Sequence, residues 1–472
     1  MKRISTYTLG CKLNVAESSA LAQEYLQKGY QLVPFGEKSD LTIINTCSVT
    51  EQANVKCRNV VRKALKASPE AFVAVVGCYA QLEPEALASI EGVDAVLGAK
   101  EKFEMASLLG DFEKTGETKI LVSDIETVSG FGFGHSISLE NSKDQTRAYL
   151  KVQDGCNYTC SYCTIPLARG KSRSESIDKI IFQANLLKEA GYQEIVLTGV
   201  NIGDFGNLPD GTEGLYTFFD LLKEIEKVEV PRIRISSIEP NLLTSEMIDF
   251  ISSSKRIVPH FHLPMQSGSV EILKRMRRRY TKELYQERVF EVVNKIPNVC
   301  IGADVIVGFP GETDAHFEET FEFIQSLPIS YLHVFTFSKR PNTNAAELID
   351  ENIFEDIRPE VKKARNQKLT ELSYFKWKQY VSRFINQIDE VLFENEFSDD
   401  TELNSEIGFS EVEGKTLCFG HTPNYLRVGV EVPSRAWAKE HLIRKRKPVQ
   451  LTAIDSDLNV IGTFLDAEVI AT

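Results

Sequence analysis

The sequence predicts an α/β protein in three parts: a parallel α/β domain, a partial (β/α)6 barrel and a small antiparallel β-barrel at the end. One observation behind this prediction is the length, since 472 residues correspond to about three ordinary domains rather than one core. The other is the order of the patterns. Strand-like and helix-like segments alternate through most of the chain, and short strand-like runs follow in its last part.

Residues 1–126 predict the first domain. An apolar strand at residues 4–9 leads into a helical pattern that begins at Asn14 and stops at Gly29, a residue type that commonly ends helices. The same unit recurs twice, with strands at 41–46 and 72–77 and helices at 51–67 and 83–90. Strands that alternate with helices predict a parallel sheet covered by those helices.

The second part is predicted at residues 145–377, after a Gly-, Ser- and Phe-rich stretch at 127–144 that reads as a linker or lid. Helical segments such as 176–190 and 314–325 leave room for right-handed crossovers between parallel strands. A six-stranded partial barrel is the simplest arrangement, with an open sheet as the alternative. The predicted strands are 148–152, 194–198, 232–236, 260–264, 301–307 and 331–337.

The third part is predicted at residues 378–472, after a charged helix at 359–378. Short alternating runs predict a small antiparallel β-barrel of about the size of the nucleic-acid-binding OB class. These runs are 391–393, 416–419, 426–430, 449–453 and 460–464.

Composition excludes several classes of protein. With 42% hydrophobic and 26% charged residues, the chain is neither disordered nor collagen-like nor mainly coiled coil. The longest apolar stretch, residues 71–78, is far shorter than the roughly 20 residues of a membrane-spanning helix, and no signal peptide is visible. We therefore expect a cytoplasmic protein without a membrane partner. Its nine cysteines are then metal ligands or buried thiols rather than disulfides.

The net charge of −13 excludes binding to nucleic acid through overall charge alone. Basic residues still cluster at 274–279, 339–340 and 444–447. Solvated helix faces and loop edges account for any one of these clusters, so an RNA contact requires a second, independent indication.

Cys156, Cys160 and Cys163 form a CxxxCxxC run directly after the first strand of the predicted barrel. Three thiolates within eight residues can turn toward one small centre, and thiolates bind both zinc and iron–sulfur clusters. A four-iron cluster normally takes four cysteines, so three of them leave one position open, as catalysis requires. The alternative is structural zinc completed by a distant Cys or His.

Cys11, Cys47 and Cys78 are far apart in sequence but share a position. Each stands at or just after the carboxyl end of a predicted parallel strand. Strand ends of one parallel sheet lie along one edge, where ligands gather, so these three can converge. Burial as apolar residues is the alternative for each one. The cysteines that lack such placement are assigned to packing: Cys57, Cys300 and Cys418.

The run from Asp154 to Cys163, with Tyr162 before its last cysteine, resembles the signature of the radical S-adenosylmethionine (SAM) superfamily. The resemblance implies that Cys156, Cys160 and Cys163 hold a 4Fe-4S cluster whose fourth iron binds the amino and carboxylate groups of SAM. It places Tyr162 near the adenine. It also implies reductive cleavage of SAM to a 5′-deoxyadenosyl radical and a partial (β/α) barrel.

Two cysteine triads, an N-terminal α/β domain and a terminal β-barrel together resemble the methylthiotransferase branch of that superfamily. The resemblance implies a second 4Fe-4S cluster, held by Cys11, Cys47 and Cys78, that handles the inserted sulfur. It also implies a terminal TRAM domain, marked by residues 420–425. Segments similar to the enzymes for N6-threonylcarbamoyladenosine in tRNA are 9–14, 45–50, 77–81, 236–240 and 278–281.

Four further positions at strand ends of the barrel are candidates for binding SAM: Thr198, Gly199, Gln266 and Gly308. In this superfamily the second strand end usually supplies backbone contacts to the methionine amino group. Gln266 can offer a hydrogen bond, and glycine permits a close approach of backbone and ligand. Ordinary strand-ending turns are the alternative at these positions, and His262 nearby is as readily a core histidine.

RNA binding gains its second indication from the terminal β-barrel. Single-stranded loops are recognised by stacking and by phosphate contacts. Tyr425 with Arg427, or residues 277–279 near the barrel mouth, are candidates for both kinds of contact.

The resemblance leads to one functional hypothesis: insertion of sulfur and a methyl group at carbon 2 of N6-threonylcarbamoyladenosine in tRNA. Its implied partners are the anticodon loop of tRNA and a reductant protein such as flavodoxin or ferredoxin. The alternatives are the isopentenyladenosine enzyme, the enzyme for a ribosomal-protein aspartate, and a non-catalytic zinc-bound RNA-binding protein. No catalytic acid, base or nucleophile is assigned, since no such group of residues shows interpretable spacing.

Overall fold

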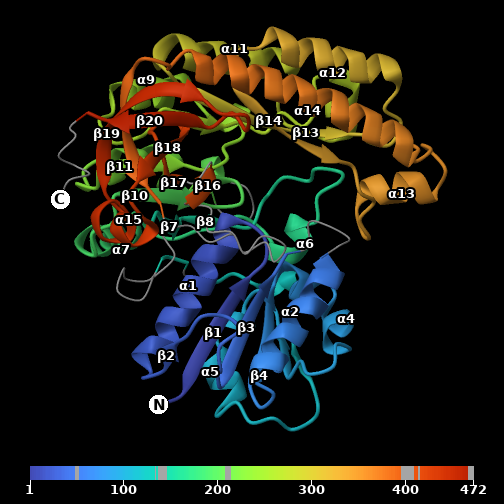
Figure 1. The fold of residues 1–472 in the computed structure, drawn as a ribbon. Coiled ribbons are helices and arrows are strands. Elements are labelled where there is room, and N and C mark those ends of the chain that lie inside the picture. The colour runs from blue at the N-terminus through green and yellow to red at the C-terminus, as the bar shows by residue number, and fades with distance from the viewer. Residues whose placement is uncertain are drawn as a thin grey trace.

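The structure is a computed structural model, and Figure 1 shows its three parts, with the N-terminal sheet below the barrel and α6 between them. The predicted helix start at 51–52 and, within the predicted linker, residues 133 and 137–144 lie outside the described residues. The described ranges are 1–47, 53–132, 134–136, 146–207, 214–394, 409–412 and 415–465.

The N-terminal part is a six-stranded parallel sheet in the order β2-β1-β3-β4-β5-β6. Its strands are β1 (Arg3–Thr8), β2 (Gln31–Leu32), β3 (Leu41–Thr46), β4 (Phe72–Gly77), β5 (Ala95–Leu97) and β6 (Lys119–Leu121). Its helices are α1 (Lys12–Gln27), α2 (Ala53–Ala67), α3 (Cys78–Leu82), α4 (Pro84–Ala88) and α5 (Met105–Leu109). Every residue of β3 and β4 is buried, because helices cover both faces.

The central part contains all six predicted strands, in two parallel sheets of order β7-β10-β11 and β12-β13-β14. The strands are β7 (Ala148–Lys151), β10 (Glu194–Thr198), β11 (Arg232–Ile235), β12 (His260–His262), β13 (Cys300–Val307) and β14 (Tyr331–Thr336). Parallel bridges from Ile233 to Ile257 and from Ser237 to His262 join the sheets across the β11/β12 seam. The six strands therefore form one arc, the predicted partial barrel.

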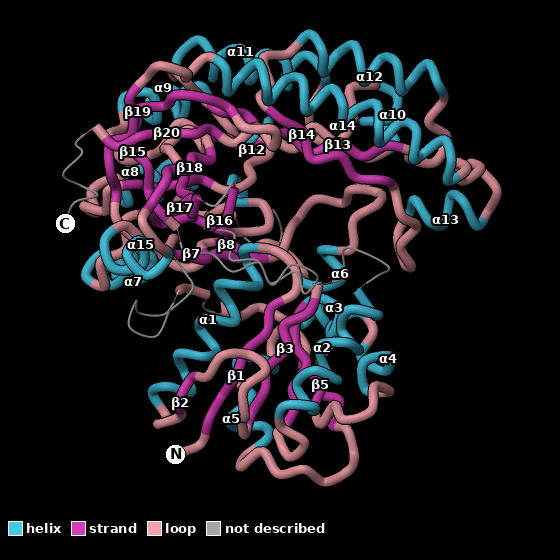
Figure 2. Tube along the Cα trace, viewed as in Figure 1, coloured by secondary structure: helices cyan, strands magenta, loops and turns pink. Residues whose placement is uncertain are grey.

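Helices cover the outer face of this arc, as Figure 2 shows for α11, α12 and α14. The helices of the central part are α6 (Ile165–Arg169), α7 (Ile177–Glu189), α8 (Phe218–Ile225), α9 (Ser245–Ser253), α10 (Val270–Arg275), α11 (Lys282–Lys295), α12 (Asp314–Ser326), α13 (Asn344–Asp350) and α14 (Pro359–Ser382). Ala303 and Val305 of β13 are buried in the same core as Val289 and Val292 of α11. A short hairpin, β8 (Gln153–Asp154) with β9 (Arg173–Ser174), leads into the cysteine loop.

The terminal part is a closed five-stranded barrel, because β15 pairs with both β19 and β17. Its elements are β15 (Ile388–Phe393), β16 (Phe409–Val412), β17 (Lys415–His421), β18 (Arg427–Val432), α15 (Arg435–His441), β19 (Arg446–Ile454) and β20 (Val460–Phe464). The predicted antiparallel barrel is confirmed with one difference: β18 and β20 run parallel. The reason is that β19 lies between them in the chain and is antiparallel to β20.

Helix α14 links the last two parts. The sequence places a boundary at residue 378, and α14 continues through that point. Leu369 and Leu372 belong to the barrel core, whereas Tyr380 and Val381 belong to the core of the terminal barrel. A helix shared by two cores limits how far they can move relative to each other.

Two further contacts join the parts. Arg232 of β11 donates to the backbone oxygens of His421 and Glu390, at 3.0 Å and 2.6 Å, which fixes the terminal barrel against the central one. Residues 134–136, within the predicted linker, run along β7 through backbone hydrogen bonds to Tyr149 and Lys151. Among the described helices, none combines the length and apolar character needed to cross a membrane.

Candidate functional site

The CxxxCxxC segment is a loop held on several sides by backbone hydrogen bonds. The amide of Cys156 donates to Gly170, and the amide and hydroxyl of Ser161 donate to the backbone oxygens of Met276 and Arg275. Cys156, Cys160 and Cys163 lie close enough for their charges to influence one another. The structure thus brings the three predicted ligands together in one ordered loop.

Burial keeps these thiols protonated. It raises the pKa of Cys156 and of Cys163 to about 12 each. A metal centre must therefore displace their protons when it binds, as thiolate ligation generally requires.

Arg278 holds the middle cysteine of the loop. Its Nη1 donates to Cys160 Sγ at 3.2 Å and to the Tyr162 hydroxyl at 3.5 Å, and its Nη2 pairs with the Glu239 carboxylate. Its side chain is only 3% exposed. Tyr162 meets Phe309 edge-on, with ring centroids 6.4 Å apart. Hydrogen bonds to cluster sulfurs are known to tune iron–sulfur centres, so this guanidinium is well placed to do so.

The second triad lies at the carboxyl edge of the N-terminal sheet, as predicted. Cys11 and Cys78 begin α1 and α3, and the charge of Cys78 influences Cys11. Gly10, with φ of 113°, lies so close to Cys47 that a Cβ added at Gly10 would stand 2.6 Å from the Cys47 Cβ. Gly77, with φ of 102°, likewise faces the backbone oxygen of Thr46 at 2.3 Å from an added Cβ. Only glycine permits this convergence of three strand ends.

Arg169 connects the two cysteine sites, and the sequence does not predict this role. It ends α6, just after the CxxxCxxC loop, and its Nε donates to Cys78 Sγ at 3.2 Å. Its Nη1 contacts Glu17 at 2.9 Å and Asp154 at 3.0 Å, and its Nη2 contacts Asn14 at 2.6 Å. One buried guanidinium therefore bridges the N-terminal domain and the barrel.

A network of buried charges surrounds Arg169. Glu17 pairs with Lys102 at 2.6 Å and with Lys151 at 2.8 Å, and Asp154 pairs with Lys151 at 2.6 Å and with Arg173 at 3.2 Å. In this network four cations face two carboxylates, so positive charge is in excess beside Cys78. Buried charge requires compensation. An anionic centre ligated by thiolates would provide it, which makes the second triad suitable for a cluster.

Orphaned polar groups mark the carboxyl ends of β10 and β11. The hydroxyls of Thr198 and Ser236 and both amide atoms of Asn201 are buried without a hydrogen-bond partner among the described residues. Buried polar groups are normally paired, so these atoms are suited to a polar ligand. Gly199 lies against Gln153, whose Oε1 accepts from the amides of Val200 and Asn201. The residues here fit SAM as a ligand.

Two other predicted positions have different surroundings. Gln266 adopts φ of 64°, and its amide donates to Asp304 while its carbonyl accepts from Ile306. Its strained backbone crosses over the end of β13. Gly308 donates its amide to Glu312 at 2.8 Å, and a Cβ added there would stand 2.5 Å from Lys362 Cγ, so α14 occupies that side of Gly308.

The RNA contacts predicted for Tyr425 with Arg427 and for residues 277–279 stay predictions, and several of these side chains also have contacts within the protein. Tyr425 stacks between His260 and His421, at centroid distances of 4.5 Å and 4.9 Å. Its ring is thus used inside the interface with the terminal barrel. Arg278 holds Cys160, as described above, and Arg279 donates to the backbone oxygen of Asn157. Sequence alone could not show that Arg278 contacts Cys160.

The remaining cysteines have the packing role assigned to them, since each is fully buried: Cys57, Cys300 and Cys418. The charged residues around the two triads that the sequence does not reveal are buried or partly buried, with no periodic pattern: Glu17, Lys102, Lys151, Asp154, Arg169, Glu239 and Arg278.

Comparison with known proteins agrees with this geometry. Residues 3–98 match the family described as "Uncharacterized protein family UPF0004", and residues 150–324 match the radical SAM superfamily. The chain also resembles the structure of the radical S-adenosylmethionine methyltransferase TsrM from Kitasatospora setae, with a TM-score of 0.56 and 15% identity over 75% of this chain and 78% of that one. That likeness concerns the fold alone.

Sequence relatives are more specific. The chain is 39% identical to the threonylcarbamoyladenosine tRNA methylthiotransferase MtaB of Bacillus subtilis, over 91% of this chain and 90% of the relative. It is 38% identical to the protein of the same name from Aquifex aeolicus, over 81% and 90%. A tRNA-2-methylthio-N(6)-dimethylallyladenosine synthase of Acetivibrio thermocellus is 33% identical over 82% and 79%. The chain therefore belongs to the threonylcarbamoyladenosine tRNA methylthiotransferase family within the radical SAM superfamily.

Proposed function

We propose that this protein is a radical SAM methylthiotransferase that replaces the C2–H of N6-threonylcarbamoyladenosine in tRNA with a methylthio group. The observation that carries the proposal is the pair of cysteine triads, which one buried arginine, Arg169, links across two domains. Relatives of that name share 36–39% identity with the chain over most of its length. An aromatic C–H has no acidic proton at neutral pH, which is why radical chemistry suits the reaction.

The radical SAM cluster belongs in the first of these sites. Cys156, Cys160 and Cys163 would hold a 4Fe-4S cluster that leaves one iron for SAM. When both are bound, the cluster and SAM supply a 5′-deoxyadenosyl radical. The unpaired hydroxyls of Thr198 and Ser236 would bind the polar part of SAM at the neighbouring strand ends. Tyr162, Gly199, Gln266 and Gly308 remain proposed neighbours of the same ligand.

A second 4Fe-4S cluster is proposed at Cys11, Cys47 and Cys78. The excess of buried cations around Arg169 supports a negatively charged centre here. When bound, this cluster supplies the site for the sulfur that is inserted. Arg169 would orient Cys78 and keep the two triads in a fixed relation, because its remaining donors are bound to carboxylates of both domains.

The proposed partners are the anticodon loop of tRNA and a reductant protein such as flavodoxin or ferredoxin. The terminal barrel, proposed as a TRAM domain, would anchor the RNA. Its basic segment 444–447 contributes Lys445, which is exposed, whereas Arg446 is engaged with Glu390 and Gln193 at the domain interface. The proposed location is the cytoplasm, where tRNA and SAM are present.

Nucleoside analysis tests the proposed substrate. The gene is expressed in a bacterial strain that makes N6-threonylcarbamoyladenosine but lacks its own 2-methylthio derivative, and digested tRNA is analysed by mass spectrometry. We expect the 2-methylthio derivative to appear with the wild-type protein and to be absent with the Cys160→Ala variant. A 2-methylthio product on dimethylallyladenosine alone, or no thiolated nucleoside at all, would contradict the proposal.

A further inference from the structure

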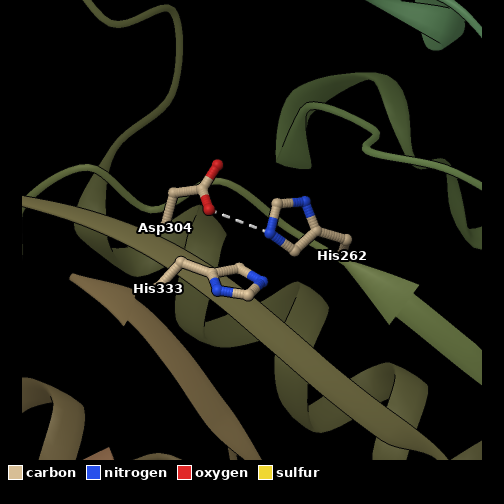
Figure 3. A group of neighbouring side chains, drawn as sticks. All are labelled: His262, Asp304 and His333. Atoms are coloured by element: carbon tan, nitrogen blue, oxygen red, sulfur yellow. Dashed lines mark hydrogen bonds and ion pairs between the residues drawn. The ribbon is translucent and has the colours of Figure 1, made fainter. Parts of the chain in front are cut away.

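A polar cluster lies on the inner face of the β12–β14 sheet, and none of its residues belongs to either cysteine triad. His262 Nε2 and Asp304 Oδ1 are 2.9 Å apart, and the Ser237 hydroxyl lies 2.6 Å from His262 Nδ1. His333 joins them from β14, where it stands directly opposite Asp304 in the register. Figure 3 shows the three labelled side chains close together. One nitrogen or oxygen atom from each lies within 4.8 Å of the others.

This cluster is open to a ligand. The His262 and Asp304 side chains are 15% and 21% exposed, and His333 is exposed. Phe335, two residues along the same face of β14, is 46% exposed, although the opposite face of the sheet is packed under helices. An exposed aromatic beside exposed polar groups, inside a partial barrel, is typical of a binding surface rather than of a core.

A cation from the N-terminal domain faces the same surface. Lys12 follows Cys11 at the start of α1 and is exposed. Burial is the main cause that lowers the pKa of both His260 and His333, and the charge of Lys12 adds to this effect. Lys12 thus lies near enough for its charge to act on His333.

We propose that Lys12, His333 and Asp304 form the subsite that binds the N6 substituent of the substrate adenosine and selects a threonylcarbamoyl group. This inference rests on the proposed function. The substituent carries a carboxylate, a hydroxyl and ureido N–H groups. Lys12 and His333 would bind the carboxylate, and Asp304 would accept from an N–H or the hydroxyl. A dimethylallyl substituent offers none of these groups and would leave the subsite unpaired.

His262 has a positioning role in this subsite. Both of its ring nitrogens already have partners, Ser237 and Asp304, so it orients the Asp304 carboxylate. The same engagement argues against a metal ion at these three residues, because a ligating imidazole must offer a free nitrogen lone pair to the ion.

Binding measurements with the reconstituted holoenzyme test the subsite. Fluorescence anisotropy compares anticodon stem-loop RNAs that differ only at position 37: adenosine, its threonylcarbamoyl derivative, or its dimethylallyl derivative. For the wild type we expect at least about tenfold tighter binding of the threonylcarbamoyl RNA than of the adenosine RNA. Lys12→Met and His333→Asn should each remove most of this preference and leave affinity for the adenosine RNA within about twofold.

Lys38→Met is the matched control, since Lys38 is an exposed lysine of the same domain outside the subsite. It should keep the full preference. Iron content and far-ultraviolet circular dichroism verify that each variant is folded and loaded. Asp304→Asn, which keeps the shape of the side chain, should lose part of the preference.

The outcomes distinguish a failure of the proposed function from a failure of the proposed subsite. A wild type that shows no preference for the threonylcarbamoyl RNA would overturn the proposed substrate itself. A wild type with the preference, but with variants that retain it, would overturn the subsite and leave the proposed function standing. A stoichiometric divalent ion lost from the His333→Asn protein, with iron content unchanged, would show a metal centre instead and would also overturn the subsite.

Discussion

Replacing Cys156, Cys160 and Cys163 together by Ala should abolish cleavage of SAM and halve the iron content. Anaerobically reconstituted wild type should hold about eight irons per chain, and the triple variant about four. The reason is that the loop supplies all three thiolates of this site, while its backbone anchors at Gly170, Met276 and Ala345 do not depend on the sulfurs. Iron assays and detection of 5′-deoxyadenosine measure the two effects.

The matched control replaces the three packing cysteines, Cys57, Cys300 and Cys418, by Ala. These thiols are buried in apolar surroundings, so the change should leave iron content and SAM cleavage intact at some expense of stability. If the loop variant still produced 5′-deoxyadenosine, the radical site would lie elsewhere and our assignment would be wrong.

Glu17→Gln should destabilise the junction of the first two domains by about 3–5 kcal/mol, the cost typical of removing one partner from a buried ion pair. Glu17 is fully buried and its carboxylate binds Lys102, Lys151 and Arg169. Without its charge, the four buried cations keep only Asp154 as a counter-ion. Hydrogen exchange of the α1 and β1 amides measures this loss locally, which suits a multidomain chain better than one unfolding midpoint.

Glu24→Gln on the same helix is the matched control. Glu24 forms only an exposed pair with Lys28, and its removal should change stability by less than about 0.5 kcal/mol. Equal protection of the amides in both variants would contradict the role given to the buried network.

The pH dependence of the Glu17 effect has a defined sign. Burial by itself would raise the pKa of Glu17, but the charges of Arg169, Lys102 and Lys151 outweigh it and hold the pKa well below its ordinary value. A carboxylate of this kind contributes its full stability above its unfolded pKa of about 4.3 and loses it only as the pH falls through the lower folded value. The loss of stability caused by Glu17→Gln should therefore be constant between about pH 6 and 8.

Sequence reasoning placed the cysteines of the second triad at one sheet edge because strand ends are visible in the pattern. Cys47 and Cys78 follow buried runs that become β3 and β4, and parallel strands bring their carboxyl ends to one edge. The six barrel strands follow in the same way from apolar runs separated by helices. Signals of this kind are local in the chain, and the structure confirms them.

Contacts between domains leave no such local pattern in the sequence. Arg169 meets Cys78 and Glu17 across 91 and 152 residues of sequence, and nothing in its neighbourhood marks it as buried. Ser237, His262 and Asp304 likewise come from three different strands or strand ends. Tyr425 stacks on His260 of the central barrel, a contact that depends on how the two barrels pack. Such features depend on tertiary structure, which periodicity does not encode.

The most direct test of the central claim, that two cysteine sites divide the chemistry, uses the variant in which Cys11, Cys47 and Cys78 are all replaced by Ala. After anaerobic reconstitution, its iron content, its 5′-deoxyadenosine and its thiolated tRNA product are measured in the same sample. The account predicts about four irons per chain, continued formation of 5′-deoxyadenosine and no 2-methylthio product. A normal yield of 2-methylthio product from this variant would contradict the account.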